Sequence, residues 1–284
     1  MSKLSEVADR QAAMGTIVNL TSVFEGLASM RIAQTKNQVQ QSQGFFSELW
    51  HIYSQLRVDK LFRFGRQQSD KPIDKELYII ITSEGGFSGD IDQKLINIML
   101  KTYDPAKQDI IVVGHHGAVL LIQNSVTFKK YFTLPARDKN INVQPLVQEV
   151  RHYRSTVAFY QTYVSLMVQD VKRIELNVAV QEEGKRVAAK EEIISEANYI
   201  FEPSTYEVIA HLERTMLEVA LSQVILDSKL AQYASRFRAM SMANDRADEL
   251  SHDLDLLYNR TKRRQQDERL KEIINGLRKA ELVR

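Results

Sequence analysis

The chain lacks cysteine, and it lacks any long apolar run. Without cysteine among its 284 residues it has no disulfides, thiolate metal sites or cysteine nucleophiles, which is typical of a reducing compartment. No apolar run approaches the roughly 18 residues of a membrane span, and the N-terminus lacks the apolar core of a signal peptide. We therefore expect no direct membrane insertion, and any association with a membrane to go through partner proteins.

Proline and glycine, the residues that interrupt helices, are scarce at the C-terminal end. All five prolines lie between residues 72 and 203, and residues 204–284 contain a single glycine, Gly276. This composition permits one uninterrupted helix over 204–284. Its apolar residues recur mostly at alternating steps of three and four, which predicts a coiled-coil seam. Asn244 occupies one position of this seam, and two consecutive steps of three end at Leu250. The seam residues are Leu230, Tyr233, Phe237, Met240, Ala247, Leu250, Leu254 and Leu257.

The N-terminal residues 1–58 also read as a helix with one apolar face. Three glycines are scattered through it, and each allows a second backbone to come close while costing about 1 kcal/mol of helix stability. We expect it to pair with the C-terminal helix, so that 1–58 and 204–284 form one antiparallel coiled coil; an ordinary helical bundle is the alternative. The apolar positions are Leu4, Val7, Met14, Val18, Phe24, Leu27 and Met30.

The middle of the chain, residues 59–203, changes to the pattern of a small Rossmann-like α/β domain. Residues 76–82 and 109–114 are β-branched runs typical of buried parallel strands, and a third strand is expected within 126–134. Helices are expected over 90–103, with Ile91, Leu95, Ile98 and Met99 inward, and over 117–123. Strand, helix and strand at this spacing predict a right-handed crossover.

The remainder of this middle segment is expected to form a helix and a hairpin. The helix runs from Pro145 to about Val168. Strict alternation over 174–180 predicts a half-exposed strand that pairs with 186–194 across a turn at 182–185. The fold class is thus α/β, with a long antiparallel coiled coil of the two chain ends.

Candidate catalytic and binding groups are weak. The glycine-rich residues 85–89 follow a strand, but Asp90 comes next, where a phosphate loop needs lysine and a hydroxyl residue, so a tight structural turn is the better interpretation. His115 and His116 are adjacent and cannot easily bind one ion without a third ligand. No Ser/His/Asp grouping or pair of carboxylates stands out. We expect no catalytic residue, no cofactor and no metal.

Charge and apolar residues are concentrated near the C-terminus. From Arg260 to Arg284 there are nine Lys/Arg against four Asp/Glu. This end is interpreted either as a solvated helix face, as a phosphate-binding surface of a nucleic-acid or scaffold protein, or as a helix whose end enters another protein. A basic cluster beyond the seam is followed by apolar residues at helical spacing, which favours the last interpretation. The cluster is Arg260, Lys262, Arg263 and Arg264, and the apolar residues are Leu270, Ile273, Ile274 and Leu277.

Short motifs in order along the chain carry a family resemblance. They are residues 31–34 (RIAQ), 83–89 (SEGGFSG), 199–204 (YIFEPS), 236–240 (RFRAM), 256–260 (LLYNR) and 272–276 (EIING). Each resembles a motif of the gamma subunits of F-type ATP synthases, and together they cover the chain from end to end. Ser83, Gly86, Gly89 and Glu202 stand at the family's structural motif positions.

The resemblance implies a central rotor shaft, itself non-catalytic, that couples ion flow to ATP synthesis or hydrolysis. Its implied partners are three alpha and three beta subunits around the coil, with the epsilon subunit and the membrane c-ring at the α/β domain; no nucleic acid is implied. The implied location is peripheral, on the cytoplasmic face of a bacterial plasma membrane. The resemblance assigns Arg260, Lys262, Arg263, Arg264 and Arg269 to the beta-subunit levers. It assigns an apical bearing to Ile273, Ile274, Leu277, Leu282 and Val283.

The chain departs from the family at several of these positions. The family's Arg-Gln pair is here Lys262-Arg263, its Thr-Gln-Glu triplet is residues 267–269 (DER), and its lysine-rich N-terminal pattern is replaced by Ile17, Leu20 and Val23. These departures indicate a divergent member. The alternative is a gamma-like shaft of a specialised, hydrolysis-driven rotary ATPase.

Overall fold

The computed structural model describes residues 3–55, 73–134, 136, 138, 141–176, 202 and 204–281. It divides into two compact units. The coil unit comprises Met1–Leu27 and Arg238–Arg284, and the sheet unit comprises Ala28–Phe237. Two long helices, α1 (Lys3–Gln55) and α6 (Thr205–Glu281), contribute residues to both units.

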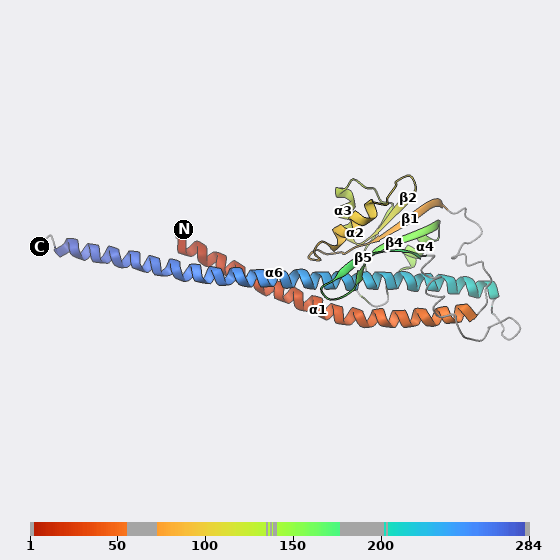
Figure 1. The fold of residues 1–284 in the computed structure, drawn as a ribbon, viewed down its shortest axis with the longest axis horizontal. Coiled ribbons are helices and arrows are strands. Elements are labelled where there is room, and N and C mark those ends of the chain that lie inside the picture. Colours follow the sequence, from red (N-terminus) through yellow and green to blue (C-terminus); the bar gives the residue numbers. More distant parts are fainter. Residues whose placement is uncertain are drawn as a thin grey trace. The chain divides into compact units, whose positions relative to one another are not determined.

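The sheet unit is built on a five-stranded sheet in the order β3-β2-β1-β4-β5. Figure 1 labels β2, β1, β4 and β5 among these strands. Strand β1 pairs in parallel with β2 and β4, and β2 pairs in parallel with β3, whereas β5 runs antiparallel to β4. A parallel strand that is covered on both faces consists of a continuous run of apolar residues. The last five residues of β1, 77–81, are accordingly all buried. The strands are β1 (Ile73–Ile81), β2 (Gln108–Val113), β3 (Lys130–Phe132), β4 (Tyr153–Tyr163) and β5 (Gln169–Glu175).

Helices cover both faces of this sheet. Alternate side chains of β1 point to opposite faces: Tyr78 and Ile80 pack with α2 (Ile91–Leu100) and α3 (His115–Gln123), and Ile79 packs with α4 (Gln144–Val150) and α6. The buried residues of α6 on that second face are Leu217, Leu221, Val224 and Ile225. The N-terminal part of α6 is therefore core material of the α/β fold.

Most of the expected α/β elements occur where the sequence predicted them, with three corrections. The helix expected from Pro145 to Val168 is wrong: α4 ends at Val150 and β4 takes up residues 153–163, whose aromatic and β-branched side chains suit a central strand. In α2, Ile98 is 39% exposed and Ile96 is buried instead. Strand β5 pairs with β4, while the rest of the expected hairpin, 177–194, lies outside the described residues.

In the coil unit, the two helices pair antiparallel through a regular seam. The Gln11 amide donates to Asp255 Oδ1 at 2.5 Å, and Thr21 Oγ1 donates to Asn244 Oδ1 at 2.8 Å, so the partner number falls as the α1 number rises. Buried and half-buried positions of α6 alternate by four and three residues, as a coiled coil requires. The positions in this alternation are Met240, Asn244, Ala247, Ser251, Leu254, Tyr258, Thr261 and Gln265, and Ser241, Ala243 and Asp255 are half-buried beside them.

This seam corrects the one expected from the apolar residues. Leu250 and Leu257 are 44% and 46% exposed, and Ser251 and Tyr258 occupy the seam positions next to them. The expected seam has irregular spacing near Leu250 because it was drawn through the leucines. The regular alternation of three and four residues passes through Ser251 and Tyr258 instead. The seam residues Leu230 and Phe237 belong to the helix pair of the sheet unit, where Leu230 packs with Ile32, Val39, Leu226 and Ala234.

Candidate functional site

The glycine-rich loop 83–89 leaves β1 at its carboxyl end and is fixed by a buried carboxylate. Asp92 is fully buried and accepts a hydrogen bond from Ser83 Oγ at 2.5 Å. Gly89 has a φ of 66°, which glycine adopts without strain. The loop is therefore a built turn around Asp92.

The same carboxylate brings His116 and Gln161 together. His116 Nδ1 lies 2.7 Å from Asp92 Oδ2, and the Gln161 amide donates to Asp92 Oδ1 at 2.5 Å. The hydrogen bond with Asp92 raises the pKa of His116 above its ordinary value, against the opposing effect of burial. A nucleophilic serine needs a base that takes its proton; Ser83 instead donates to a carboxylate that His116 already engages. This cluster is a structural network. No sequence pattern reveals it, because its members come from four separate segments: the loop after β1, α2, α3 and β4.

Loop 83–89 is also attached to helix α6. Ser235 Oγ donates to the carbonyl oxygen of Ser88 at 2.6 Å, and Arg236 Nε donates to that of Gly86 at 3.4 Å. Burial lowers the pKa of the Arg236 guanidinium. Arg236, the first residue of the motif 236–240, thus contacts the distant motif 83–89 within the sheet unit. Glu202, the remaining motif position, is exposed.

The basic cluster lies on the exposed surface of α6 in the coil unit. Arg260, Lys262, Arg263 and Arg264 are all exposed, as is Arg269. Arg264 Nε lies 3.3 Å from Glu268 Oε1, an exposed pair one helical turn apart. We call Arg260, Lys262, Arg263 and Arg264 the basic band. Its cations are presented to the surroundings and do not pack into the coil.

The C-terminal end of α6 carries large apolar side chains on its surface. Leu270, Ile273, Ile274 and Leu277 are exposed, and we call them the apolar tip. Leu282 and Val283, assigned to the same bearing, lie outside the described residues. Within the part of the chain that the structure describes, no residue covers this apolar surface of the helix.

A second exposed apolar surface, on α1, was not anticipated. Phe24 and Leu27, expected to face the coil, are exposed, while Val18 and Thr21 take the seam. The spacing of the apolar residues of α1 departs from alternating steps of three and four, and this departure was the sequence signal that some of them lie outside the seam. The exposed residues, which we call the α1 stripe, are Ile17, Leu20, Val23, Phe24 and Leu27.

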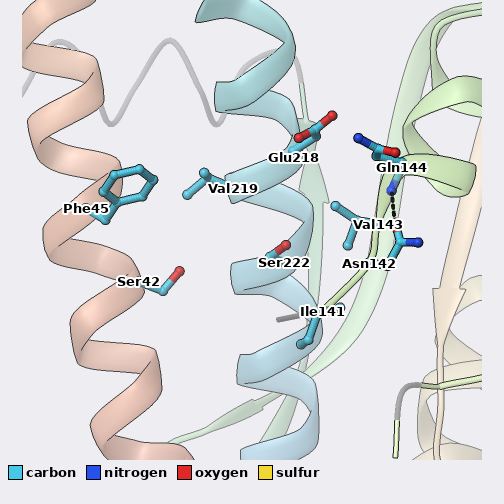
Figure 2. A pocket seen from close by; sticks show the side chains of 9 residues that line it. All are labelled: Ser42, Phe45, Ile141, Asn142, Val143, Gln144, Glu218, Val219 and Ser222. Carbon is cyan, nitrogen blue, oxygen red and sulfur yellow. Dashed lines mark hydrogen bonds between the residues drawn. The ribbon is translucent and has the colours of Figure 1, made fainter. Parts of the chain in front are cut away.

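A pocket of about 460 Å³ lies within the sheet unit, between α1, α6 and the segment before α4 (Figure 2). Asn142 Oδ1 accepts a hydrogen bond from the Gln144 backbone N–H at 3.2 Å, and Glu218 is the charged residue of the lining. The lining mixes hydroxyl, amide and apolar groups without a convergent set of titratable side chains, and so has no evident catalytic arrangement. It is formed by Ser42, Phe45, Ile141, Asn142, Val143, Gln144, Glu218, Val219 and Ser222.

Two properties of the described residues bear on the site. Among them, no group of three or more His, Asp or Glu side chains is placed to hold a metal ion. In the same part of the chain, no helix is both long and apolar enough to cross a membrane.

Comparison with known proteins identifies the family. Residues 3–278 match the family model described as ATP synthase. The ATP synthase gamma chain of Clostridium novyi is 23% identical over 90% of this chain and 91% of its own length, and that of Mesoplasma florum is 22% identical over 97% and 98%. The rotor of the Euglena gracilis mitochondrial ATP synthase matches with a TM-score of 0.62 at 14% identity, over 92% of this chain and 98% of that one. The chain therefore belongs to the ATP synthase family and, within it, to the gamma chains, the non-catalytic subunits of the central stalk.

Proposed function

We propose that this chain turns as the central shaft of an F-type rotary ATP synthase and couples ion flow through a membrane ring to ATP synthesis or hydrolysis. The observation that carries the proposal is the apolar surface of the coil unit, where the α1 stripe and the apolar tip are exposed. Soluble monomers rarely expose large contiguous apolar surfaces, and such surfaces mark contacts with other proteins. A ring of three alpha and three beta subunits around the coil would cover them.

The basic band and the apolar tip have different tasks in this proposal. Cations of the band attract acidic lever loops of the beta subunits, and exposed ion pairs of this kind contribute about 0.2–1 kcal/mol each. Pairs this weak form and break at every rotary step. Arg269 lies in the same region of α6 and is exposed. The tip turns in an apolar collar, where few directional bonds oppose rotation.

The sheet unit serves as the foot of the shaft. It would bind the epsilon subunit and the c-ring, and so hold the chain peripherally at the cytoplasmic face of a bacterial plasma membrane. The gamma chains compared above come from bacteria, which supports the bacterial membrane. Contact with a c-ring is supported by a structural relative, the central stalk and c-ring of the Tetrahymena thermophila mitochondrial ATP synthase, at 16% identity and a TM-score of 0.56 over 79% of this chain and 99% of that one.

Purification of the native complex through a tag on this chain tests the proposal. Alpha, beta and epsilon subunits and a c-ring are expected in the purified complex, with ATP hydrolysis that responds to an ion gradient. The control is a tagged variant with Leu20→Gln and Val23→Gln, which should recover less alpha and beta subunit because two residues of the α1 stripe become polar.

The outcomes separate the alternatives. Recovery of alpha and beta subunits without a c-ring would indicate a specialised hydrolysis-driven motor. Recovery of neither, together with steeply salt-dependent DNA binding by the chain alone, would indicate a nucleic-acid-binding scaffold and overturn the proposal.

A further inference from the structure

One buried carboxylate in the sheet unit is bonded to both long helices. Asp138 lies on the segment between β3 and α4, and its side chain is 4% exposed. Its partners lie on α1, about a hundred residues before it in the sequence, and on α6, about a hundred residues after it. We call the five residues the Asp138 clamp: Arg31, Thr35, Asp138, Lys229 and Tyr233.

Each carboxylate oxygen serves one helix. Oδ1 pairs with the ammonium group of Lys229 and accepts a hydrogen bond from the Tyr233 hydroxyl at 3.2 Å, both on α6. Oδ2 accepts a hydrogen bond from Thr35 Oγ1 at 3.2 Å and lies 3.8 Å from an Arg31 guanidinium nitrogen, both on α1. Asp138 therefore fixes the α/β domain to two helices through one side chain.

The burial of this ion pair argues for a role other than stability. The Lys229 side chain is 3% exposed, and taking both charges out of water costs much of what their attraction returns. Apolar residues of the same size often stabilise such a site equally well, and fixing the register of packed helices is the best-attested use of a buried polar group.

Among the described residues, the helix contacts beside the clamp are mainly apolar. The helices pack beside the clamp through Ile32, Val39, Leu226, Leu230 and Ala234, all apolar. Apolar contacts are non-directional, so they resist sliding and rotation of one element past another less specifically than paired charges and hydrogen bonds do. The bonds of loop 83–89 and Gln161 go to α6, whereas Asp138 engages α1 as well.

We propose that Asp138 is the torque-coupling residue of this chain: it locks the rotating α/β domain to both helices of the shaft at one point, so that they turn as one body. The inference rests on the proposed function, because it assumes that the domain turns with a c-ring. Asp138 acts through the helices and contacts no reacting group, so its role is that of a positioning residue.

The experiment uses the complete native complex in sealed vesicles and compares the ion gradient built with the ATP hydrolysed. The key variant is Asp138→Asn with Lys229→Gln, which leaves a neutral hydrogen-bonding pair and no unpaired buried charge. We expect this complex to assemble and to hydrolyse ATP, while the gradient built per ATP falls about tenfold, the factor that corresponds to 1.4 kcal/mol. Asp138→Glu keeps the charge and should retain most of the wild-type ratio.

The control removes a more exposed ion pair elsewhere in the sheet unit. Lys75→Gln with Asp109→Asn deletes a pair at 3.0 Å that joins β1 to β2 and involves neither long helix. A structural effect would lower assembly and thermal stability in both double variants but leave the gradient per ATP of the assembled complexes unchanged.

The outcomes are distinct. A wild-type ratio in the Asp138/Lys229 variant, or an equal fall in the Lys75/Asp109 control, would overturn the role of Asp138 while leaving the proposed function in place. If the double variant does not assemble, the Asp138→Glu complex decides, because it keeps the charge. A tenfold fall in its gradient built per ATP would contradict a role for that charge. A wild-type complex that builds no gradient would overturn the proposed function and the inference together.

Discussion

At the scale of single residues, Gly114 is the described glycine at which the surrounding atoms leave least room for a side chain. It follows β2 with a φ of 105°, and a Cβ there would lie 2.1 Å from the carbonyl oxygen of Thr82. Gly114→Ala should therefore lower the free energy of unfolding through backbone strain and through overpacking, each about 1–3 kcal/mol. Denaturant unfolding measures this loss. Gly86→Ala is the matched control, since no atom lies within 4 Å of its added Cβ, and it should change stability by about 0.5 kcal/mol or less.

His116 gives the fold a pH dependence. Its folded-state pKa lies above the ordinary value of about 6.5 because of the hydrogen bond with Asp92. A raised pKa means that the bond's contribution to stability is fully present below pH 6.5 or so and is lost as the pH rises through the folded-state pKa. The melting temperature of the wild-type chain should thus fall more than that of His116→Gln between about pH 5.5 and 8.5. His115→Gln, at an exposed neighbour, should follow the wild type; parallel curves for all three chains would contradict the prediction.

At the scale of the element, two leucines four residues apart on α6 distinguish the observed seam from the expected one. Leu254 is half-buried in the regular alternation of the coil unit, whereas Leu250 is 44% exposed. Leu254→Asp should lower coil stability by about 2 kcal/mol or more, through lost burial and the cost of placing a carboxylate among apolar groups. Leu250→Asp should cost about 0.5 kcal/mol or less. Helical circular dichroism during heating measures both changes. An equal loss of coil stability in the two variants would mean that Leu250 also lies in the seam.

The sequence predicted those elements whose signal is local. The run at 76–82 predicts a buried strand because its β-branched residues suit a parallel sheet covered on both faces, and β1 forms there. Residues 153–163 were assigned to a helix although they carry a strand's aromatic and β-branched side chains. The proline at the start of α4 marks a helix without saying where it ends.

Long-range arrangements could not be predicted in this way. Asp138 carries no local signal, since its partners Thr35 and Lys229 come from opposite ends of the chain. The seam residue Ser251 is polar, so a pattern that follows the leucines passes over it although the regular steps of three and four include it. The basic band, in contrast, was evident because it depends on the composition of one helical segment.

At the scale of the whole molecule, the basic band and the apolar tip should respond differently to salt in the assembled complex. Reversing Lys262 and Arg263 to glutamate should lower coupled ATP turnover while leaving the alpha–beta ring assembled, because in the proposed function these exposed cations attract acidic loops of the beta subunits. The loss should shrink at high salt, since the Debye length falls from about 10 Å at 0.1 M to about 3 Å at 1 M. Reversal of two exposed lysines of the α/β domain, Lys101 and Lys107, is the charge-matched control and should leave turnover unchanged.

Truncation after Leu270 probes the tip separately. It removes Ile273, Ile274 and Leu277, which are exposed, and keeps the whole basic band. Apolar contact with a collar depends on the area removed from water and is not screened by dissolved ions as charge pairs are. The truncated shaft should therefore dissociate from the ring faster, with a smaller response to salt than the charge reversals show. Dissociation measured by pull-down over time at low and high salt checks this difference. Charge reversals without effect on turnover at low salt would make the band a solvated helix face, and a truncation with the full salt response of the band would mean that the two surfaces do not act separately.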